Sequence, residues 1–359
     1  MTDNGDRREQ GLAAPWEVPV RVAVVGVGYW GPNLVRNLYE LPSAEVVRIC
    51  DTKSGPLNAL QGRYPGLQRT TRFQDLLDDR SIEAIAIATP VSTHYELASQ
   101  ALLAGKHVFV EKPIADSSLA ARKLLDLAEE HDLVLMPGHT FLYSPPVNLI
   151  RSLIESGDLG DIYFVSTSRV NLGLHQSDVS VAWDLGPHDF SILRYWLNET
   201  PSHVTALSRA CIVPGTPDVA FINLEFPSGT IAHVELSWLA PSKLRRTTIV
   251  GSKKMVVYDD TSNEPVRIFD SGASLPNPET FGEYKLTYRT GDILSPRVEA
   301  AEPLYLELSD FCGSVRSKRR PRSSAELGVE VVRIIEAVDS SLAEHGARIE
   351  LASSTSALV

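Results

Sequence analysis

Residues 20–31 read VRVAVVGVGYWG, a short run of mostly branched apolar residues that passes directly into three closely spaced glycines. The apolar run has the length and composition of a buried β-strand. Pro32 suits the first turn of a helix, and apolar residues then recur at helical spacing. A second apolar run, residues 45–50, ends on Asp51, 20 residues after Gly31. A strand, three glycines, a helix and an acid at this distance form the fingerprint of a dinucleotide-binding βαβ unit.

This fingerprint predicts which groups hold the cofactor. Glycines let the backbone approach a pyrophosphate, which the unpaired N–H groups of the helix N-terminus stabilise. Asp51 would accept hydrogen bonds from the adenosine ribose and repel a 2′-phosphate, so we expect NAD rather than NADP. The contacts expected from this unit are Gly26, Gly28, Tyr29, Trp30, Gly31 and Asp51.

Strands and helices keep alternating up to residue 138, which predicts a parallel sheet covered on both faces. Thr89, Pro90 and His94 follow the carboxyl end of the expected strand 82–88, so they should line the cofactor crevice. For His94 the alternative is a solvent-exposed position beside a helix N-cap.

Residues 107–113 read HVFVEKP, a buried strand stopped by two opposite charges and a proline. Pro113 cannot donate to a sheet ladder and biases Lys112 away from helix, so the strand ends here. Ligands of open parallel sheets lie beyond the carboxyl ends of the strands, which places Glu111 and Lys112 beside cofactor and substrate. The alternative is an ordinary solvated pair of charges.

After residue 138 the strands follow one another instead of alternating with helices, and several alternate apolar with polar residues. The expected strands are 162–170, 203–210, 219–226, 231–239, 246–250 and 255–258. Residues 260–298 show no periodicity. The fold class is therefore a doubly wound parallel Rossmann sheet followed by an open, mostly antiparallel sheet with helices on one face. We expect a disordered arm at 1–19, a dinucleotide-binding domain at 20–138, and a substrate-binding and oligomerisation domain at 139–359.

One expected helix of the second domain, starting at Trp183, carries Asp184 and His188 four residues apart. This spacing puts both side chains on one face, where a carboxylate can fix the tautomer of an imidazole and raise its basicity. The pair is a candidate general base. The alternative is that Asp184 caps the helix and His188 is a partly buried polar residue.

Bulk properties exclude several classes of function. The net charge of −11 argues against nucleic acid or an acidic membrane as the main partner. The three cysteines, Cys50, Cys211 and Cys312, are far apart, so we expect neither disulfides nor a metal site, as suits the cytoplasm. Residues 1–19 lack the apolar core of a signal peptide, and no apolar run reaches the ~20 residues that span a bilayer.

The combination of the glycine fingerprint, Glu-Lys-Pro at 111–113 and Asp-x-x-x-His at 184–188 resembles the Gfo/Idh/MocA oxidoreductase family, over nearly the whole chain from residue 20. The resemblance implies that Lys112 polarises or protonates the substrate oxygen, that His188 exchanges its proton, and that Asp184 orients His188. It also implies a cis peptide bond between Lys112 and Pro113.

Three further stretches, 138–143, 169–174 and 183–189, resemble the branch that oxidises nucleotide-linked amino sugars and uronic acids at the 3-hydroxyl, such as UDP-N-acetylglucosamine 3-dehydrogenases. This closer resemblance implies substrate contacts from Tyr143, Arg169, Asn171 and Trp183, besides Lys112, Asp184 and His188. A diphosphate would also need cations; the candidates are Arg169, Lys243, Arg245 and Arg246, each of which could equally be an ordinary surface charge.

Three other functions remain open. The substrate could be a free sugar or an inositol-like cyclitol, or the enzyme could be a 3-ketoreductase of deoxysugar biosynthesis. A non-catalytic NAD-binding regulator is the alternative from another class, although it would have no chemical need for Lys112, Asp184 and His188 together. We also expect a homodimer or homotetramer formed through the second sheet, because few helices follow it and its outer face carries apolar residues such as Phe221.

Overall fold

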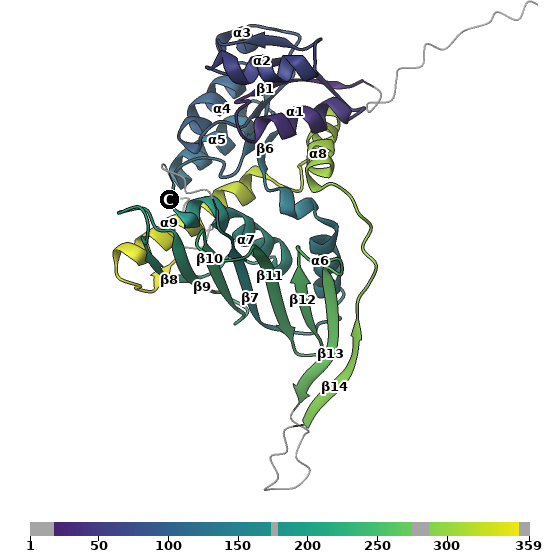
Figure 1. Cartoon of the computed structure of the whole chain (residues 1–359), viewed down its shortest axis with the longest axis vertical. Coiled ribbons are helices and arrows are strands. Elements are labelled where there is room, and N and C mark those ends of the chain that lie inside the picture. Colours follow the sequence, from purple (N-terminus) through teal and green to yellow (C-terminus); the bar gives the residue numbers. More distant parts are fainter. Residues whose placement is uncertain (1–17, 174–178, 275–286, 352–359) are drawn as a thin grey trace, which may run out of the picture.

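The computed structural model describes residues 18–173, 179–274 and 287–351, which form two sheets with their helices (Figure 1). The arm expected at 1–19 lies almost wholly outside the described residues. Among the described helices, none is long and apolar enough to cross a membrane.

The first sheet has six strands in the order β3-β2-β1-β4-β5-β6, and every neighbouring pair is parallel. Apolar strands alternate with helices because each parallel connection must cross over a face of the sheet, as predicted. The elements are β1 (Val20–Val25), α1 (Gly31–Glu40), β2 (Ala44–Cys50), α2 (Ser54–Arg63), β3 (Gln68–Thr70), α3 (Gln74–Leu77), β4 (Ala84–Ile87), η1 (Val91–Thr93), α4 (His94–Leu103), β5 (His107–Glu111), α5 (Ser118–Glu130) and β6 (Leu135–Gly138).

The second sheet has nine strands in the order β14-β13-β12-β11-β7-β10-β9-β8-β15. All neighbours are antiparallel except β7 and β10, which are parallel, so the predicted fold class is confirmed. The remaining elements are η2 (Thr140–Tyr143), α6 (Pro145–Glu155), β7 (Ile162–Val170), α7 (Val181–Leu197), β8 (His203–Arg209), β9 (Val219–Glu225), β10 (Ile231–Ser237), β11 (Leu244–Gly251), β12 (Met255–Asp259), β13 (Val266–Ser274), β14 (Thr287–Leu294), α8 (Pro303–Ser317), α9 (Ala325–Ala343) and β15 (Ile349–Glu350).

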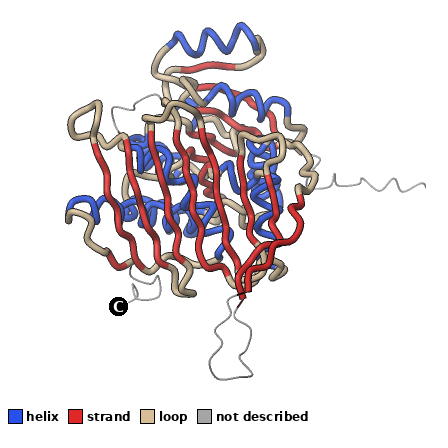
Figure 2. The backbone as a smooth tube through the Cα atoms, turned by 60° about the horizontal axis from the view of Figure 1, so that its bottom comes forward, coloured by secondary structure: helices blue, strands red, loops and turns tan. Residues whose placement is uncertain are grey.

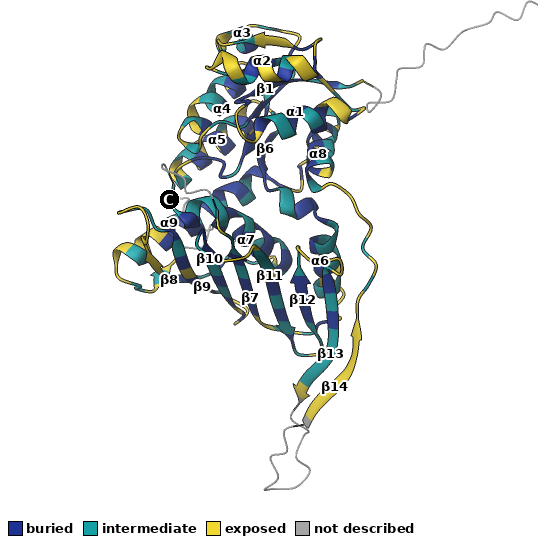
Figure 3. Ribbon diagram, in the orientation of Figure 1, coloured by how far each residue is buried: buried dark blue, intermediate teal, exposed yellow. Residues whose placement is uncertain are grey.

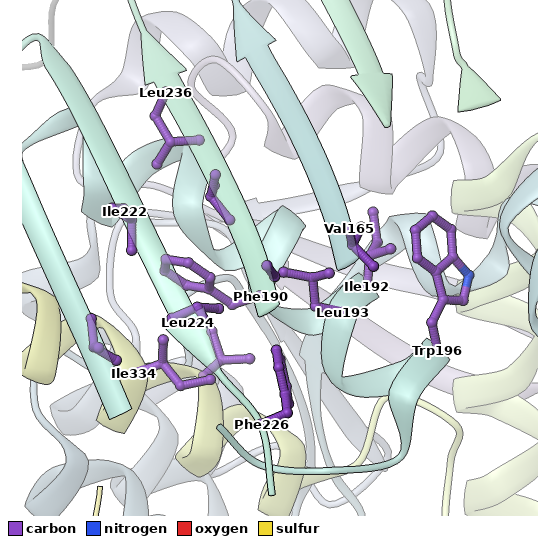
Figure 4. Packing of buried hydrophobic residues seen from close by; sticks show 14 of the residues in the cluster. Val165, Phe190, Ile192, Leu193, Trp196, Ile222, Leu224, Phe226, Leu236 and Ile334 are labelled. Carbon is purple, nitrogen blue, oxygen red and sulfur yellow. The ribbon is translucent and has the colours of Figure 1, made fainter. Parts of the chain in front are cut away.

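Helices α6, α7 and α9 cover one face of the second sheet, and the other face lies open (Figure 2). Successive side chains along each strand point alternately to the covered face and to the open face. The residues of β9 and β10 that point to the covered face form a core with Phe190 and Leu193 of α7 (Figure 4). This packing fixes α7, which carries the candidate residues Asp184 and His188.

Helix α8 packs on the first sheet although it follows the second in sequence. Its residues Leu308, Phe311 and Cys312 share a core with β1 and α1. Each sheet forms a unit with the helices that pack on it. Helix α9 contributes Val329 to the core of the first unit and Ile334 to the core of the second. The expected boundary at residue 138 therefore leaves out α8, which belongs to the core of the first unit.

Candidate active site

A cavity of about 860 Å³ lies between the two units at the carboxyl ends of β4, β5 and β6. Its walls come from the glycine loop, the ends of those strands, η2, α7, the start of β11, the end of β12, and the start of α8. The cavity is therefore built from parts of both units.

The glycine loop leaves no room for side chains at two of its three glycines. Gly26 has a φ of 82°, and a Cβ there would lie 2.7 Å from the carbonyl of Ala88. A Cβ on Gly31 would lie 2.0 Å from the carbonyl oxygen of Gly26. A Cβ on Gly28 would meet no described atom within 4 Å, so its backbone is open to a ligand. This cradle fits the pyrophosphate of a dinucleotide.

Asp51 stands beside the loop. One carboxylate oxygen accepts a hydrogen bond from the Val27 N–H at 3.0 Å and the other from the Lys53 N–H at 2.8 Å. The side chain is only half-buried, so lone pairs remain for ribose hydroxyls. Lys53 is exposed.

Lys112 reaches from the end of β5 to α7. Its Nζ lies 2.7 Å from the main-chain oxygen of Asp184 and 3.2 Å from Oδ1 of the same residue. Oδ2 of Asp184 accepts a hydrogen bond from the Trp238 indole at 3.2 Å. Asp184 therefore orients Lys112, and the prediction that it orients His188 is wrong. The bond between Lys112 and Pro113 is cis, as the resemblance implied.

His188 lines the cavity one helical turn after Asp184. Its Nδ1 is buried and has no hydrogen-bond partner among the described residues. The ring packs edge-on against Phe141, with centroids 5.0 Å apart. Burial, and then the charges of Lys112, Arg169 and Arg245, hold the pKa of His188 well below its usual value, so the imidazole is neutral at neutral pH.

A buried polar group lies behind Lys112. Glu111 lines the cavity, and burial raises its pKa to about 7. Glu307 of α8 accepts a hydrogen bond from Thr140 at 2.7 Å, and burial followed by the Glu111 charge raises its pKa well above the usual range. His139 is buried, and desolvation lowers its pKa to about 3. Sequence reasoning missed Glu307 because it lies far along the chain.

Three predicted contacts point away from the cavity. The Tyr143 hydroxyl donates to Asp310 of α8 at 2.6 Å, and the Trp183 indole donates to Asp339 of α9 at 2.7 Å. Both side chains hold helices together instead. His94 is buried, with one ring nitrogen 2.8 Å from the Pro113 oxygen and the other 2.8 Å from the Thr89 oxygen. Its ring therefore braces two cavity loops and cannot contact the cofactor directly, and the exposed alternative is wrong as well.

The two remaining predicted substrate contacts also lie off the cavity surface. Arg169 is buried in an ion pair with Asp189 at 2.6 Å. Asn171 uses its main chain to pair with Ser237 and Ala240, and its side chain is not part of the described wall. Of the cation candidates, only Arg245 lines the cavity, where it pairs with Asp260 at 3.1 Å.

Of the other expected cofactor contacts, Tyr29, Trp30, Thr89, Glu111 and Lys112 line the cavity, and Pro90 is exposed just beyond Thr89. Sequence reasoning missed Phe141 and Tyr258 as wall residues. Phe141 lies in the 138–143 stretch, and Tyr258 ends a strand, so their positions were the only signal available. Within the described ranges, no three metal-ligating side chains gather.

Comparison with known proteins identifies the family. Residues 20–139 match the Gfo/Idh/MocA oxidoreductase family with an NAD-binding Rossmann fold, and residues 147–257 match a C-terminal domain of the same family. A 4-carboxy-2-hydroxymuconate-6-semialdehyde dehydrogenase of Sphingobium sp. is 31% identical over 346 residues, covering 91% of this chain and 100% of that protein.

Two further proteins are similar to this chain. The NAD⁺-dependent scyllo-inositol 2-dehydrogenase of Bacillus subtilis is 26% identical over 72% of this chain and 79% of its own length. A UDP-N-acetylglucosamine 3-dehydrogenase from Acidithiobacillus ferrooxidans shares the fold, with a TM-score of 0.76, 23% identity, and coverage of 90% of this chain and 98% of that one. The cradle, the cavity and these matches lead to one conclusion: the chain belongs to the Gfo/Idh/MocA family and is an NAD-binding oxidoreductase.

Proposed function

We propose that this enzyme oxidises a secondary alcohol of a sugar or cyclitol ring with NAD⁺, using Lys112 and His188 as its acid–base groups. One observation carries the proposal. The ammonium of Lys112, from the first unit, and the imidazole of His188, from the second, face one cavity beside the glycine cradle. NAD⁺, when bound, supplies the hydride acceptor for the substrate carbon.

The two side chains differ in charge, which divides their roles. Lys112 is tied to Asp184 and presents a positive charge where the substrate oxygen would become negative. His188 is neutral, so its ring can take the hydroxyl proton. In the reverse direction, the protonated ring returns that proton to the oxygen of a ketone.

The charges of the cavity favour an uncharged ring as substrate. Three described cations line the wall, and each already has an acidic partner: Lys112 with Asp184, Arg36 with Glu302, and Arg245 with Asp260. A diphosphate would have to displace one of these partners. An ion pair offers both donors and acceptors, which suits the adjacent hydroxyls of a polyol. Similarity to an inositol dehydrogenase over most of the chain supports this class.

A nucleotide-linked sugar, oxidised at its 3-hydroxyl, is the second candidate. Its support is Arg245, whose side chain is 34% exposed and could exchange Asp260 for a phosphate. The resemblance of stretches 138–143, 169–174 and 183–189 to that branch supports the same substrate.

NADH formation with myo-inositol, scyllo-inositol, glucose and UDP-N-acetylglucosamine tests both candidates in one assay. We expect Lys112→Ala and His188→Ala each to lower turnover by ~10²- to 10⁴-fold with NADH binding nearly intact. Lys123→Ala and His131→Ala, exposed on or beside α5, are matched controls expected to behave as wild type. Near-normal turnover in Lys112→Ala or His188→Ala would remove that residue from the mechanism.

We also propose that the open face of the second sheet joins copies of the chain. Leu207 and Phe221 are cross-strand neighbours on this face, 63% and 43% exposed, and Phe164 and Ile231 form a similar pair at 44% and 52%. Apolar pairs left in water on a sheet face are typical of an interface, and twofold packing of the face on its copy would cover them.

A further inference from the structure

The guanidinium groups of two arginines lie over the ring of Phe141, which lines the cavity. The guanidinium carbon of Arg169 lies 4.6 Å from the centre of the Phe141 ring, and that of Arg245 lies 5.5 Å from it. The same ring meets the His188 imidazole edge-on, at 5.0 Å and 76°. Cations over an aromatic face are attracted by its quadrupole, so the arginines and Phe141 hold one another in place. His188 therefore rests against a ring that is itself fixed.

Arg169 is the more rigid of the two cations. Its Nε donates to Asp189 Oδ2 at 2.6 Å and its Nη2 to Oδ1 at 3.3 Å, and Asp189 also accepts from Thr167 at 2.9 Å. The two side chains are 7% and 4% exposed. Asp189 follows His188 directly on α7, so the guanidinium is locked to the segment that carries the imidazole.

Two atoms of this cluster are buried and lack hydrogen-bond partners among the described residues: Nη1 of Arg169 and Nδ1 of His188. Asp184, the expected partner of His188, is bound to Lys112 instead. Packing and nearby charge, rather than a carboxylate, must therefore set the orientation and protonation of the imidazole.

We propose that Arg169 is a positioning residue that acts through Phe141 to hold the His188 ring and, by its fixed charge, keeps that ring unprotonated. The part that His188 plays in turnover rests on the proposed function; the effect of Arg169 on His188 does not.

The groups around His188 come from several elements. The cationic ones are Lys112 after β5, Arg169 on β7 and Arg245 on β11, and neutral His139 precedes η2. The acidic ones are Asp184 and Asp189 on α7 and Asp260 after β12, which bind Lys112, Arg169 and Arg245 in turn. Tyr258 of β12 completes the wall. Each acid is paired with its own cation, and the charges that lower the pKa of His188, after burial, are those of Lys112, Arg169 and Arg245.

The test is an NMR titration of the full chain with ¹⁵N-labelled histidine, in which His188→Gln identifies the His188 signals. In Arg169→Gln/Asp189→Asn, which leaves no buried carboxylate unpaired, we expect the His188 midpoint to rise by about 1 pH unit. Arg169→Lys keeps the charge and should stay close to wild type. Arg151→Gln is the matched control, because Arg151 lies over Tyr195 at 4.1 Å, away from His188, and should not shift the midpoint.

Arg245→Gln tests the effect of charge at a second, half-buried site and should raise the midpoint in the same direction. An unchanged midpoint in the folded double variant would overturn the proposal, whatever the result for Arg245→Gln. So would an equal rise in Arg169→Lys, because the effect would then be one of shape alone. Thermal melting and NADH binding confirm that each variant is folded.

Turnover gives the second readout. If His188 is the base, the acidic limb of the kcat/KM profile should move up by the same amount as the NMR midpoint in the double variant. The titration needs no substrate, so a shifted NMR midpoint without turnover on any ring would leave the role of Arg169 standing and count against the proposed function. Turnover on a ring substrate with an unmoved midpoint would support the proposed function and count against the role of Arg169.

Discussion

Two glycines of the cradle should respond to alanine in opposite ways. At Gly31 an added Cβ would lie 2.0 Å from the Gly26 oxygen and 2.9 Å from its carbon, and both are backbone atoms that cannot rotate aside. At Gly28 nothing described lies within 4 Å. Gly31→Ala therefore strains the protein even without cofactor, whereas the added methyl group of Gly28→Ala would contact only a bound cofactor.

The size of each effect follows from this geometry. A contact of 2.0 Å must open by about 1 Å, and overpacking of this kind costs about 1–3 kcal/mol, or roughly 1–4 °C in Tm for a chain of this size. Gly28→Ala should keep the wild-type Tm or gain slightly, since alanine restricts the unfolded chain by about 0.4–1 kcal/mol. If the pyrophosphate passes over Gly28, its methyl group should weaken NADH binding at least ~10-fold, which is about 1.4 kcal/mol.

Circular dichroism melts and NADH fluorescence titrations on the same preparations separate the two effects. Gly28→Ala is the informative variant because its fold is expected to be intact. Wild-type affinity for NADH in Gly28→Ala would show that the cofactor does not approach this backbone. A wild-type Tm in Gly31→Ala would show that the loop has more freedom than the contact with Gly26 allows.

Three further predictions concern the cofactor, pH and assembly. The unaltered enzyme should bind NADH more tightly than NADPH, and Asp51→Ser should narrow or reverse that preference; tighter NADPH binding by the wild type contradicts the role of Asp51. Burial raises the pKa of Glu111 from its ordinary value of 4.5 to about 7, so its contribution to stability is full below pH 4.5 and is lost as the pH rises to 7. Between pH 4.5 and 7, Glu111→Gln should remove a change on the order of 3 kcal/mol in the free energy of unfolding. Urea melts at several pH values measure this free energy, and the same pH dependence in the variant as in the wild type would contradict the prediction. Light scattering should give two or four times the 39.3 kDa chain mass, reduced by Phe221→Lys; a wild-type mass near that of one chain ends the interface proposal.

Local patterns predicted most of the fold because they depend on neighbours in sequence. The strand at 162–170 was predicted with the bounds that the structure shows, since it consists largely of the β-branched and aromatic residues that favour strands. The glycine loop and the Glu-Lys-Pro turn were found for the same reason, because each constrains its own backbone. Strands β13 and β14 were missed because β14 is an exposed edge strand, with little apolar alternation to detect (Figure 3).

Side-chain partners were predicted less well, because a spacing fixes a face but not what approaches that face. Asp184 and His188 do lie one turn apart on α7, yet the carboxylate of Asp184 forms an ion pair with Lys112, which belongs to the other unit. Tyr143 looked like a cavity residue until α8, more than 150 positions later in the chain, brought Asp310 to its hydroxyl. A single sequence contains no local signal for either contact.

The division of the site between two units explains why such distant contacts matter for chemistry. Lys112 follows β5 in the first unit and His188 lies on α7 in the second, so their relative position depends on what joins the units. Two of those joints are the ion pair of Asp184 with Lys112, and helix α9, which contributes to both cores. Contacts that do not touch a substrate therefore still matter to the site, because they hold Lys112 and His188 at the cavity where we propose that both act on one substrate.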